Sequence, residues 1–140
     1  MRIAPILHIL FIQIGILGVA FSSQAQTRFL TGPEISATLS DGTFHTSNRT
    51  IWTFSSDGTQ RSQTMRSVKK SWQWTASGSW RVQADTVCWQ SKGKMTSSVN
   101  REAFEDPEAC SRVAIRKGRL NFTKGVESDK FWKWTLKRAN

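Results

Sequence analysis

The two cysteines, Cys88 and Cys110, are the residues whose chemistry this sequence indicates most directly. A cysteine pair forms a disulfide, contributes to a metal site or supplies a reactive thiol, and a metal site needs further ligands. Beyond residue 25 the chain has one histidine, His45, and no third cysteine. We therefore predict a Cys88–Cys110 disulfide, which stabilises the fold by about 3 kcal/mol in the loop-entropy account.

Short clusters of lysine and arginine are the candidate contacts with an anion. The chain has 20 basic and 10 acidic residues, a net charge of +10, which favours association with nucleic acid, anionic lipid, lipopolysaccharide or acidic glycans. The same charge also keeps a small exported protein soluble, so the clusters form a site only if they converge on one face. The candidate ligand or polyanion contacts are Arg66, Lys69, Lys70, Arg116, Lys117 and Arg119.

Catalytic, cofactor-binding and metal-binding residues are not indicated by any motif. The sequence has no nucleophile elbow, zinc-binding helix or phosphate-binding loop. A hydrolase could still use a catalytic serine paired with His45, but no motif identifies that serine. An acidic run lacks the ligand spacing of a calcium-binding loop and is expected to be a solvated loop. Its residues are Glu102, Glu105, Asp106 and Glu108.

The seven tryptophans have two interpretations. Interleaved with basic residues, they could form a stacking platform for single-stranded nucleic acid or sugar rings. Two pairs, however, are spaced two residues apart, which places both members of each pair on one face of a strand. Because leucine and isoleucine are few, we interpret most tryptophans as core residues, with one or two left for a cavity mouth, and we do not expect a nucleic-acid partner. They are Trp52, Trp72, Trp74, Trp80, Trp89, Trp132 and Trp134.

The first 25 residues predict a secretory signal peptide. Arg2 gives a positive start, residues 3–21 are almost wholly apolar, and the small residues Ser23 and Ala25 precede the expected cleavage point. An uncleaved membrane anchor is the alternative, since the apolar stretch approaches spanning length. With cleavage, residues 26–140 form a single exported domain without a stable membrane anchor, in the periplasm or outside the cell.

One short helix is expected before a strand-rich body. Thr31 or Gly32 is placed to cap it, Pro33 suits the first turn, and Glu34 suits the positive end of the helix dipole. The helix ends before residue 41 and is expected to cover one end of a sheet.

Strands follow from the alternation of apolar and polar residues after residue 50. We expect the polar strand over residues 59–66 at an edge or under a loop, a turn at residues 77–78, and a long polar excursion over residues 92–107. The fold class is therefore mostly β, an antiparallel meander that forms either a small barrel or a strongly curled sheet. The expected strands are residues 50–55, 59–66, 70–75, 80–84, 86–90, 111–117, 119–123 and 131–136.

Short motifs occur in a fixed order through residues 26–140. They are Leu30-Thr31-Gly32 with Glu34-Ile35, Asp57-Gly58-Thr59, Gly78-Ser79-Trp80-Arg81-Val82, Asp85 with Cys88-Trp89, and Cys110. This order resembles that of short exported alphaproteobacterial proteins of domain-of-unknown-function families. The resemblance implies a signal peptide, a Gly-x-Trp strand and two cysteine-bearing strands, and it implies no catalytic residues. The Gly78-Ser79-Trp80 triplet also resembles the Gly-x-Trp of lipocalins, although there it lies on the first barrel strand.

These patterns predict a non-enzymatic, exported β-module that binds an anionic cell-envelope component or a protein partner. A lipocalin-like carrier of a small apolar ligand is the first alternative, and a small hydrolase is the second. An apolar cavity would favour the carrier, whereas basic residues converging on one outer face would favour the binding module. The oligomeric state does not follow from the sequence.

Overall fold

The computed structural model describes residues 27–47, 49–64, 72–97 and 100–140, together with every side chain in these ranges except that of Trp72. The predicted leader, residues 1–25, lies outside this description. Three of the predicted anion contacts, Arg66, Lys69 and Lys70, also lie outside it.

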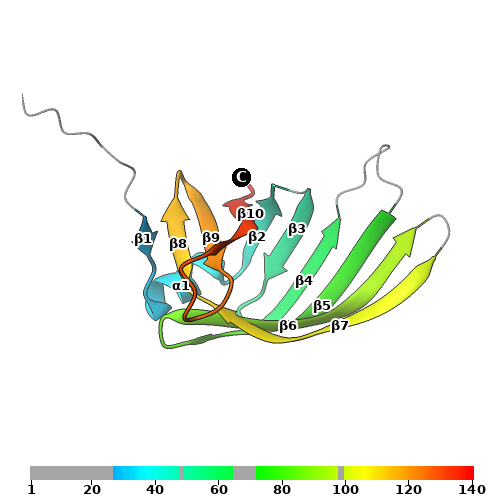
Figure 1. Cartoon of the computed structure of the whole chain (residues 1–140), viewed down its shortest axis with the longest axis horizontal. Coiled ribbons are helices and arrows are strands. Elements are labelled where there is room, and N and C mark those ends of the chain that lie inside the picture. Colours follow the sequence, from blue (N-terminus) through cyan, green and yellow to red (C-terminus); the bar gives the residue numbers. More distant parts are fainter. Residues whose placement is uncertain (1–26, 48, 65–71, 98–99) are drawn as a thin grey trace, which may run out of the picture.

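The described residues form one antiparallel sheet of ten strands and one helix (Figure 1). Across the sheet the strands lie in the order β1-β8-β9-β10-β2-β3-β4-β5-β6-β7. The mostly β, curled fold is thus confirmed. The elements are β1 (Arg28–Phe29), α1 (Gly32–Leu39), β2 (Gly42–Thr46), β3 (Thr50–Phe54), β4 (Thr59–Thr64), β5 (Trp72–Gln83), β6 (Thr86–Ser97), β7 (Arg101–Ser111), β8 (Val113–Arg116), β9 (Arg119–Thr123) and β10 (Phe131–Arg138).

The sheet is not a closed barrel, which corrects that part of the expectation. At one end it nearly closes, because only Arg112 separates β7 from β8, and the Ser111 hydroxyl donates to the Thr123 carbonyl at 2.6 Å. At the other end the long strands β5, β6 and β7 run past the shorter ones and leave as a curved wing (Figure 1). The edge strands β1 and β7 therefore do not pair, and β7 presents an open edge of 11 residues.

The helix forms as predicted. Thr31 is its N-cap, and the Glu34 carboxylate accepts hydrogen bonds from the Thr31 backbone N–H (2.8 Å) and hydroxyl (3.1 Å). Ile35 and Leu39 are fully buried. The Gly32 backbone N–H donates to the Asp85 carboxylate (2.7 Å), which holds the helix against the turn between β5 and β6.

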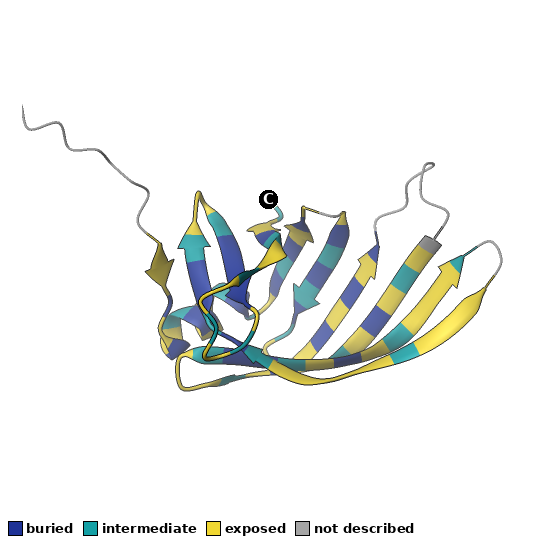
Figure 2. Ribbon diagram, viewed as in Figure 1, coloured by how far each residue is buried: buried dark blue, intermediate teal, exposed yellow. Residues whose placement is uncertain are grey.

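Aromatic rings fill the curled end of the sheet, where buried residues concentrate (Figure 2). Trp52 stacks on both Phe54 (5.9 Å) and Trp134 (5.8 Å), and Trp80 meets Phe54 edge to face. Trp80 also donates its indole N–H to the Ser55 carbonyl at 2.9 Å. Core packing thus accounts for some of the tryptophans, whereas Trp132 is 41% exposed.

Two segments predicted as turn or loop are strand. Residues 77–78 lie within β5, because a Cβ at Gly78 would come within 1.9 Å of the Gln90 carbonyl oxygen and only glycine lets β5 and β6 approach so closely. Residues 92–97 and 101–107 belong to β6 and β7, which pair as a long hairpin instead of a polar excursion. Pro107 lies on the edge strand, at the register shift between β6 and β7, where its missing N–H is tolerated.

The polar strand β4 lies in the middle of the sheet, between β3 and β5, and not at an edge. Gln60, Ser62 and Thr64 are buried on it, while Thr59, Arg61 and Gln63 alternate with them and are exposed. Two of the buried polar atoms, Gln60 Oε1 and Ser62 Oγ, have no hydrogen-bond partner within the described residues. The prediction of an edge position for this strand is therefore wrong. Its polar side chains suggested an edge, but its backbone pairs with β3 on one side and with β5 on the other.

Candidate functional site

The register of strands β3 to β7 divides their side chains between two faces. The core face carries the paired row Trp52, Ser62, Ala76, Gly93 and Phe104. The residues on either side of this row along each strand point to the opposite, outer face. Two outer rows result. They are Thr53, Arg61, Ser77, Lys92, Glu105 and Ile51, Gln63, Thr75, Lys94, Ala103.

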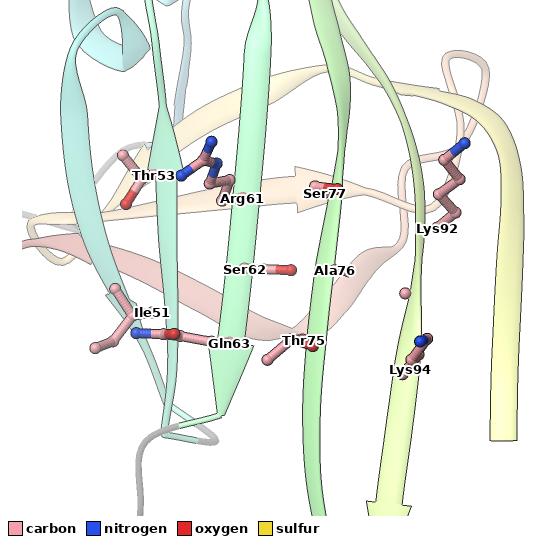
Figure 3. A pocket seen from close by; sticks show the side chains of 11 residues that line it. Ile51, Thr53, Arg61, Ser62, Gln63, Thr75, Ala76, Ser77, Lys92 and Lys94 are labelled. Atoms are coloured by element: carbon pink, nitrogen blue, oxygen red, sulfur yellow. The ribbon is translucent and has the colours of Figure 1, made fainter. Parts of the chain in front are cut away.

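A groove of about 520 Å³ lies on the outer face between these two rows (Figure 3). Its walls come from β3, β4, β5 and β6, and the small residues Ser62, Ala76 and Gly93 line its floor. Small-molecule sites are typically about 300–1,000 Å³, so this groove is of a size that holds a ligand. The residues that complete its lining are Ile51, Thr53, Arg61, Gln63, Thr75, Ser77, Lys92 and Lys94.

Among the residues that the structure describes, the groove is lined by three cations and by no acidic residue. Arg61, Lys92 and Lys94 are exposed and line the same groove, and the lining contains no aspartate or glutamate. The ion pairs between described residues do not involve these three side chains. The acidic group that interacts with Arg61 is Asp57, whose pKa is lowered chiefly by hydrogen bonds from Thr59 and only weakly by the charge of Arg61. The groove is therefore a region of positive potential.

Neutral hydrogen-bonding groups lie between the charges. The hydroxyls of Thr75 and Ser77 belong to β5, between Arg61 on β4 and the two lysines on β6. Gln63 adds an amide beside Arg61. Arginine, lysine, hydroxyl and amide groups all donate hydrogen bonds, so the set suits an anionic ligand that also carries acceptors.

A second hollow of about 540 Å³ continues the groove toward the sheet edge. It shares Lys92, Gly93 and Lys94 with the first hollow and extends to Ala103 and Glu105 on β7. The path therefore crosses five strands, from β3 to β7. Glu105 places one carboxylate at its far end.

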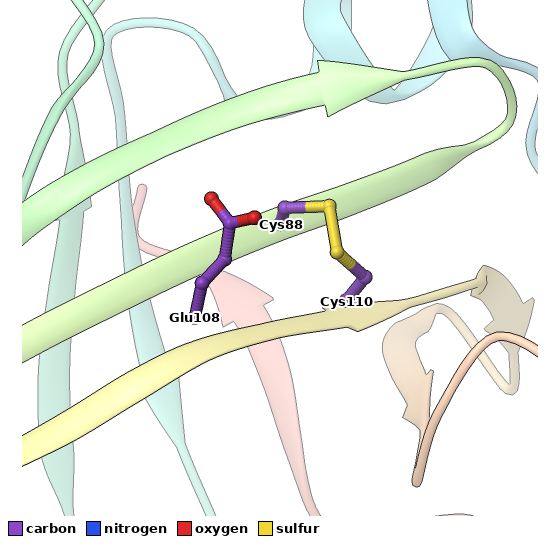
Figure 4. Close-up of side chains that lie close together, drawn as sticks. All are labelled: Cys88, Glu108 and Cys110. Atoms are coloured by element: carbon purple, nitrogen blue, oxygen red, sulfur yellow. A yellow bond between two sulfur atoms is a disulfide. The ribbon is translucent and has the colours of Figure 1, made fainter.

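The predicted disulfide joins β6 to β7 on the outer face, with a Cα–Cα distance of 4.0 Å (Figure 4). A carboxylate oxygen of Glu108 lies within 4.8 Å of both sulfurs, but a disulfide offers no thiolate for a metal. Glu108 instead forms an ion pair with Arg81 (2.7 Å), which lowers the pKa of Glu108 and raises the pKa of Arg81 through this hydrogen bond. The pair is exposed and stabilises little.

The acidic residues of β7 lie on both faces of the sheet. Glu102 and Asp106 are on the core face, and Glu105 is on the outer face.

The predicted cluster Arg116, Lys117 and Arg119 lies on the hairpin of β8 and β9, away from the groove. Strands β10, β2 and β3 separate it from β4 in the sheet. The Arg116 guanidinium lies over the Phe131 ring at 4.9 Å, and Arg119 donates to the Thr135 hydroxyl at 2.7 Å. The structure thus does not unite this cluster with the cations of the groove.

Sequence reasoning missed Arg61, Lys92 and Lys94. Lys92 and Lys94 show the two-residue spacing of a strand face, but their segment was expected to be an irregular loop. Arg61 is separated from them by some thirty positions, and only the register of β4, β5 and β6 brings the three together. The signal in the sequence is the two-residue spacing of Lys92 and Lys94, which is typical of one face of a strand.

The interior of the curled sheet has no room for a ligand at its aromatic end. Trp52, Trp89, Phe122 and Trp134 surround a gap too small for a water molecule. Phe122 and Trp134 approach to 5.1 Å, and Trp89 meets both of them edge to face or nearly so. Within the described residues, the apolar cavity that a lipocalin-like carrier would need is therefore not found here.

Of the described segments, none is a helix long and apolar enough to cross a membrane. The disulfide fits an oxidising compartment, where such bonds persist. The resemblance to exported alphaproteobacterial proteins stays a prediction. Comparison with protein-family models, with curated proteins and with solved structures gives no match to this chain.

Proposed function

We propose that this protein is a non-enzymatic binding module that holds an anionic group of a cell-envelope component in its outer-face groove. The observation that carries the proposal is the convergence of Arg61, Lys92 and Lys94 on one groove whose lining contains no acidic residue. The ion pairs between described residues do not include these three cations, so the cations remain able to attract an external anion.

The energetics favour modest, salt-sensitive binding. Two unit charges 4 Å apart attract by about 1 kcal/mol in water and by about 4 kcal/mol near a protein surface. Three exposed cations together can therefore hold a multiply charged group, and ions in the medium screen the attraction over about 8 Å at physiological salt. An abundant, immobile polyanion such as an envelope polymer suits such binding, because many weak contacts add up.

Location outside the cytoplasm is part of the same proposal. The Cys88–Cys110 bond supports it, since disulfides are rare in reducing compartments. The predicted leader would provide the route. An enzymatic role draws no support from the groove, because its serines, Ser62 and Ser77, have no histidine or carboxylate among the lining residues to act as a base.

The test compares two triple variants that remove the same charge. Arg61→Gln/Lys92→Gln/Lys94→Gln alters the groove, and Arg116→Gln/Lys117→Gln/Arg119→Gln alters the hairpin cluster predicted from the sequence. Each is titrated with inorganic pyrophosphate at low salt while backbone amide resonances are followed. We expect the groove variant to bind about tenfold more weakly, a change of about 1.4 kcal/mol, and the hairpin variant to bind like the parent.

Loss of binding in the hairpin variant alone would move the site to β8 and β9 and overturn the proposal. Equal, small losses in both variants would show that net charge and not the groove attracts the anion. Amide shifts confined to strands β3 to β6 in the parent protein would support the groove.

A further inference from the structure

We infer that the ligand of the groove is an extended acidic glycan, with charged groups on alternate sugars, lying across the strands from β3 to β7. The inference rests on the proposed anion-binding function and names the class of ligand. Its starting point is the length of the path. Five neighbouring strands spaced about 4.8 Å apart give a path of about 19 Å, far longer than a single phosphate or carboxylate needs.

The path has the proportions of a channel for a chain. Residues two apart on one strand are about 6.8 Å apart, and the two outer rows are separated by this distance along their whole length. The row between them turns its side chains to the core face and offers only backbone and small residues, among them Ala76 and Gly93. A linear molecule can therefore lie between the rows without meeting a bulky side chain.

The order of groups along the path alternates between charge and hydroxyl. Arg61 lies on β4, Thr75 and Ser77 lie on β5, and Lys92 and Lys94 lie on β6. The two cationic positions are two strands apart, which is about 10 Å. A ligand that matches this order has anionic groups about 10 Å apart with a neutral, hydrogen-bonding unit between them. A glycan with an acidic group on every second sugar has this arrangement.

Single-stranded nucleic acid fits the groove poorly. Proteins that bind it provide aromatic rings on which the bases stack, and the lining of the main groove has no aromatic residue. The aromatic residue of the adjoining hollow, Phe104, has its ring against Trp74 at 5.7 Å. A lipid chain fits no better, because Ile51 is the apolar side chain that the described lining of the main groove turns to the outer face.

Glu105 gives the path a direction. It is the register partner of Lys92 on the edge strand and places a negative charge at the β7 end. A chain long enough to reach β7 therefore meets repulsion if it carries an acidic group there. Removal of this charge is expected to strengthen binding of every chain held at Lys92, and to strengthen long chains most, since only they reach β7.

The experiment measures binding of hyaluronan oligosaccharides, which carry one carboxylate per disaccharide, by calorimetry at low salt. The series runs from the disaccharide to the octasaccharide, with inorganic pyrophosphate and a thymidine oligonucleotide of matched charge as comparison probes. We expect affinity to rise by about tenfold from the disaccharide to the tetrasaccharide and then to level off, because two disaccharide repeats fill the path, and we expect the oligonucleotide to bind more weakly than the glycan. A tenfold rise corresponds to about 1.4 kcal/mol.

Two variants test the assignment of the path. Arg61→Gln/Lys92→Gln/Lys94→Gln should abolish the dependence on length, and Glu105→Gln should strengthen the octasaccharide about threefold and the disaccharide by less. The hairpin variant Arg116→Gln/Lys117→Gln/Arg119→Gln is the matched control, expected to behave like the parent. Far-ultraviolet circular dichroism of each variant verifies the fold.

The outcomes separate the two proposals. Pyrophosphate binding in the groove without any dependence on glycan length would overturn the glycan and leave the anion-binding function standing. Tighter binding of the oligonucleotide than of the glycan of equal charge would also overturn the glycan. If neither pyrophosphate nor any oligosaccharide binds, the proposed function itself is wrong.

Discussion

At the scale of the residue, the partners of a charged side chain decide its role. Arg81 is neutralised by Glu108, and Arg28 is neutralised by Glu34. Arg61, Lys92 and Lys94 carry the same charge as these two arginines, but the ion pairs between described residues do not include them. A cluster of basic letters in the sequence therefore says little about anion binding until the neighbours of each residue are known.

Glu34 makes the stability of the helix start depend on pH. The Thr31 backbone N–H, followed by Arg28, lowers the pKa of Glu34 from 4.5 to about 2. A lowered pKa in the folded state stabilises the fold above the ordinary pKa, and this contribution is lost as the pH falls from about 4.5 to about 2. We expect Glu34→Gln to flatten the stability profile in this window and to leave its shape above pH 5 unchanged. Denaturant unfolding at several pH values measures both, and parallel profiles would contradict the expectation.

Two tryptophans should respond differently to truncation. Trp80 is 7% exposed, and Trp132 is 41% exposed. We expect Trp80→Ala to lower the free energy of unfolding by about 3–5 kcal/mol, and Trp132→Ala to lower it by well under half of that. Trp80→Phe keeps an aromatic ring but loses part of the buried indole volume and the hydrogen bond to Ser55, so it should cost at least about 1 kcal/mol and less than Trp80→Ala. Thermal melts rank the three variants, and similar melting temperatures for Trp80→Ala and Trp132→Ala would disprove the difference in packing.

At the scale of the element, local rules predicted the helix, the disulfide and most short strands. Thr31, Pro33 and Glu34 are local signals, and the alternation of apolar and polar residues after residue 50 is another. The wing was missed because a polar stretch such as residues 92–97 becomes a strand through pairing with β5 and β7, which no local window contains. The groove was missed for the same reason, since its cations meet only through the register of three strands.

The disulfide links two strands of the wing to each other. It joins β6 to β7 close to the point where β7 passes into β8. We expect Cys88→Ala/Cys110→Ala to lower the free energy of unfolding by about 3 kcal/mol, since the unfolded chain regains the freedom of the closed loop. Urea unfolding of the variant measures this loss. The parent protein treated with a reductant is the control, and it should lose stability similarly. An unchanged midpoint in both would refute the role of the bond.

At the scale of the whole molecule, packing density is uneven. The curled end encloses the aromatic core, whereas the wing has half-buried or exposed apolar residues such as Trp74 and Met95 on its core face (Figure 2). The groove lies where these two regions meet, on strands that belong to both. A ligand lying across β3 to β7 would therefore contact both the curled end of the sheet and the wing.

Hydrogen exchange should separate these two regions. Amides of residues 94–97 and 101–104 on the wing are expected to exchange at least about tenfold faster than amides of β3 and β9, because local opening there exposes little apolar surface. Mass spectrometry of peptic peptides measures the rates. Uniform protection along β5 and β6 would show that the wing is as stable as the core.

The open edge of β7 bears on how the protein behaves at high concentration. An exposed edge strand invites the edges of other copies to extend the sheet, and such growth leads to fibrils. Here an arriving strand meets the carboxylates of β7 and the proline that cannot donate a hydrogen bond. Two β7 edges in particular repel each other, because each carries the same acidic run. The charges of this strand therefore oppose self-assembly through its open edge.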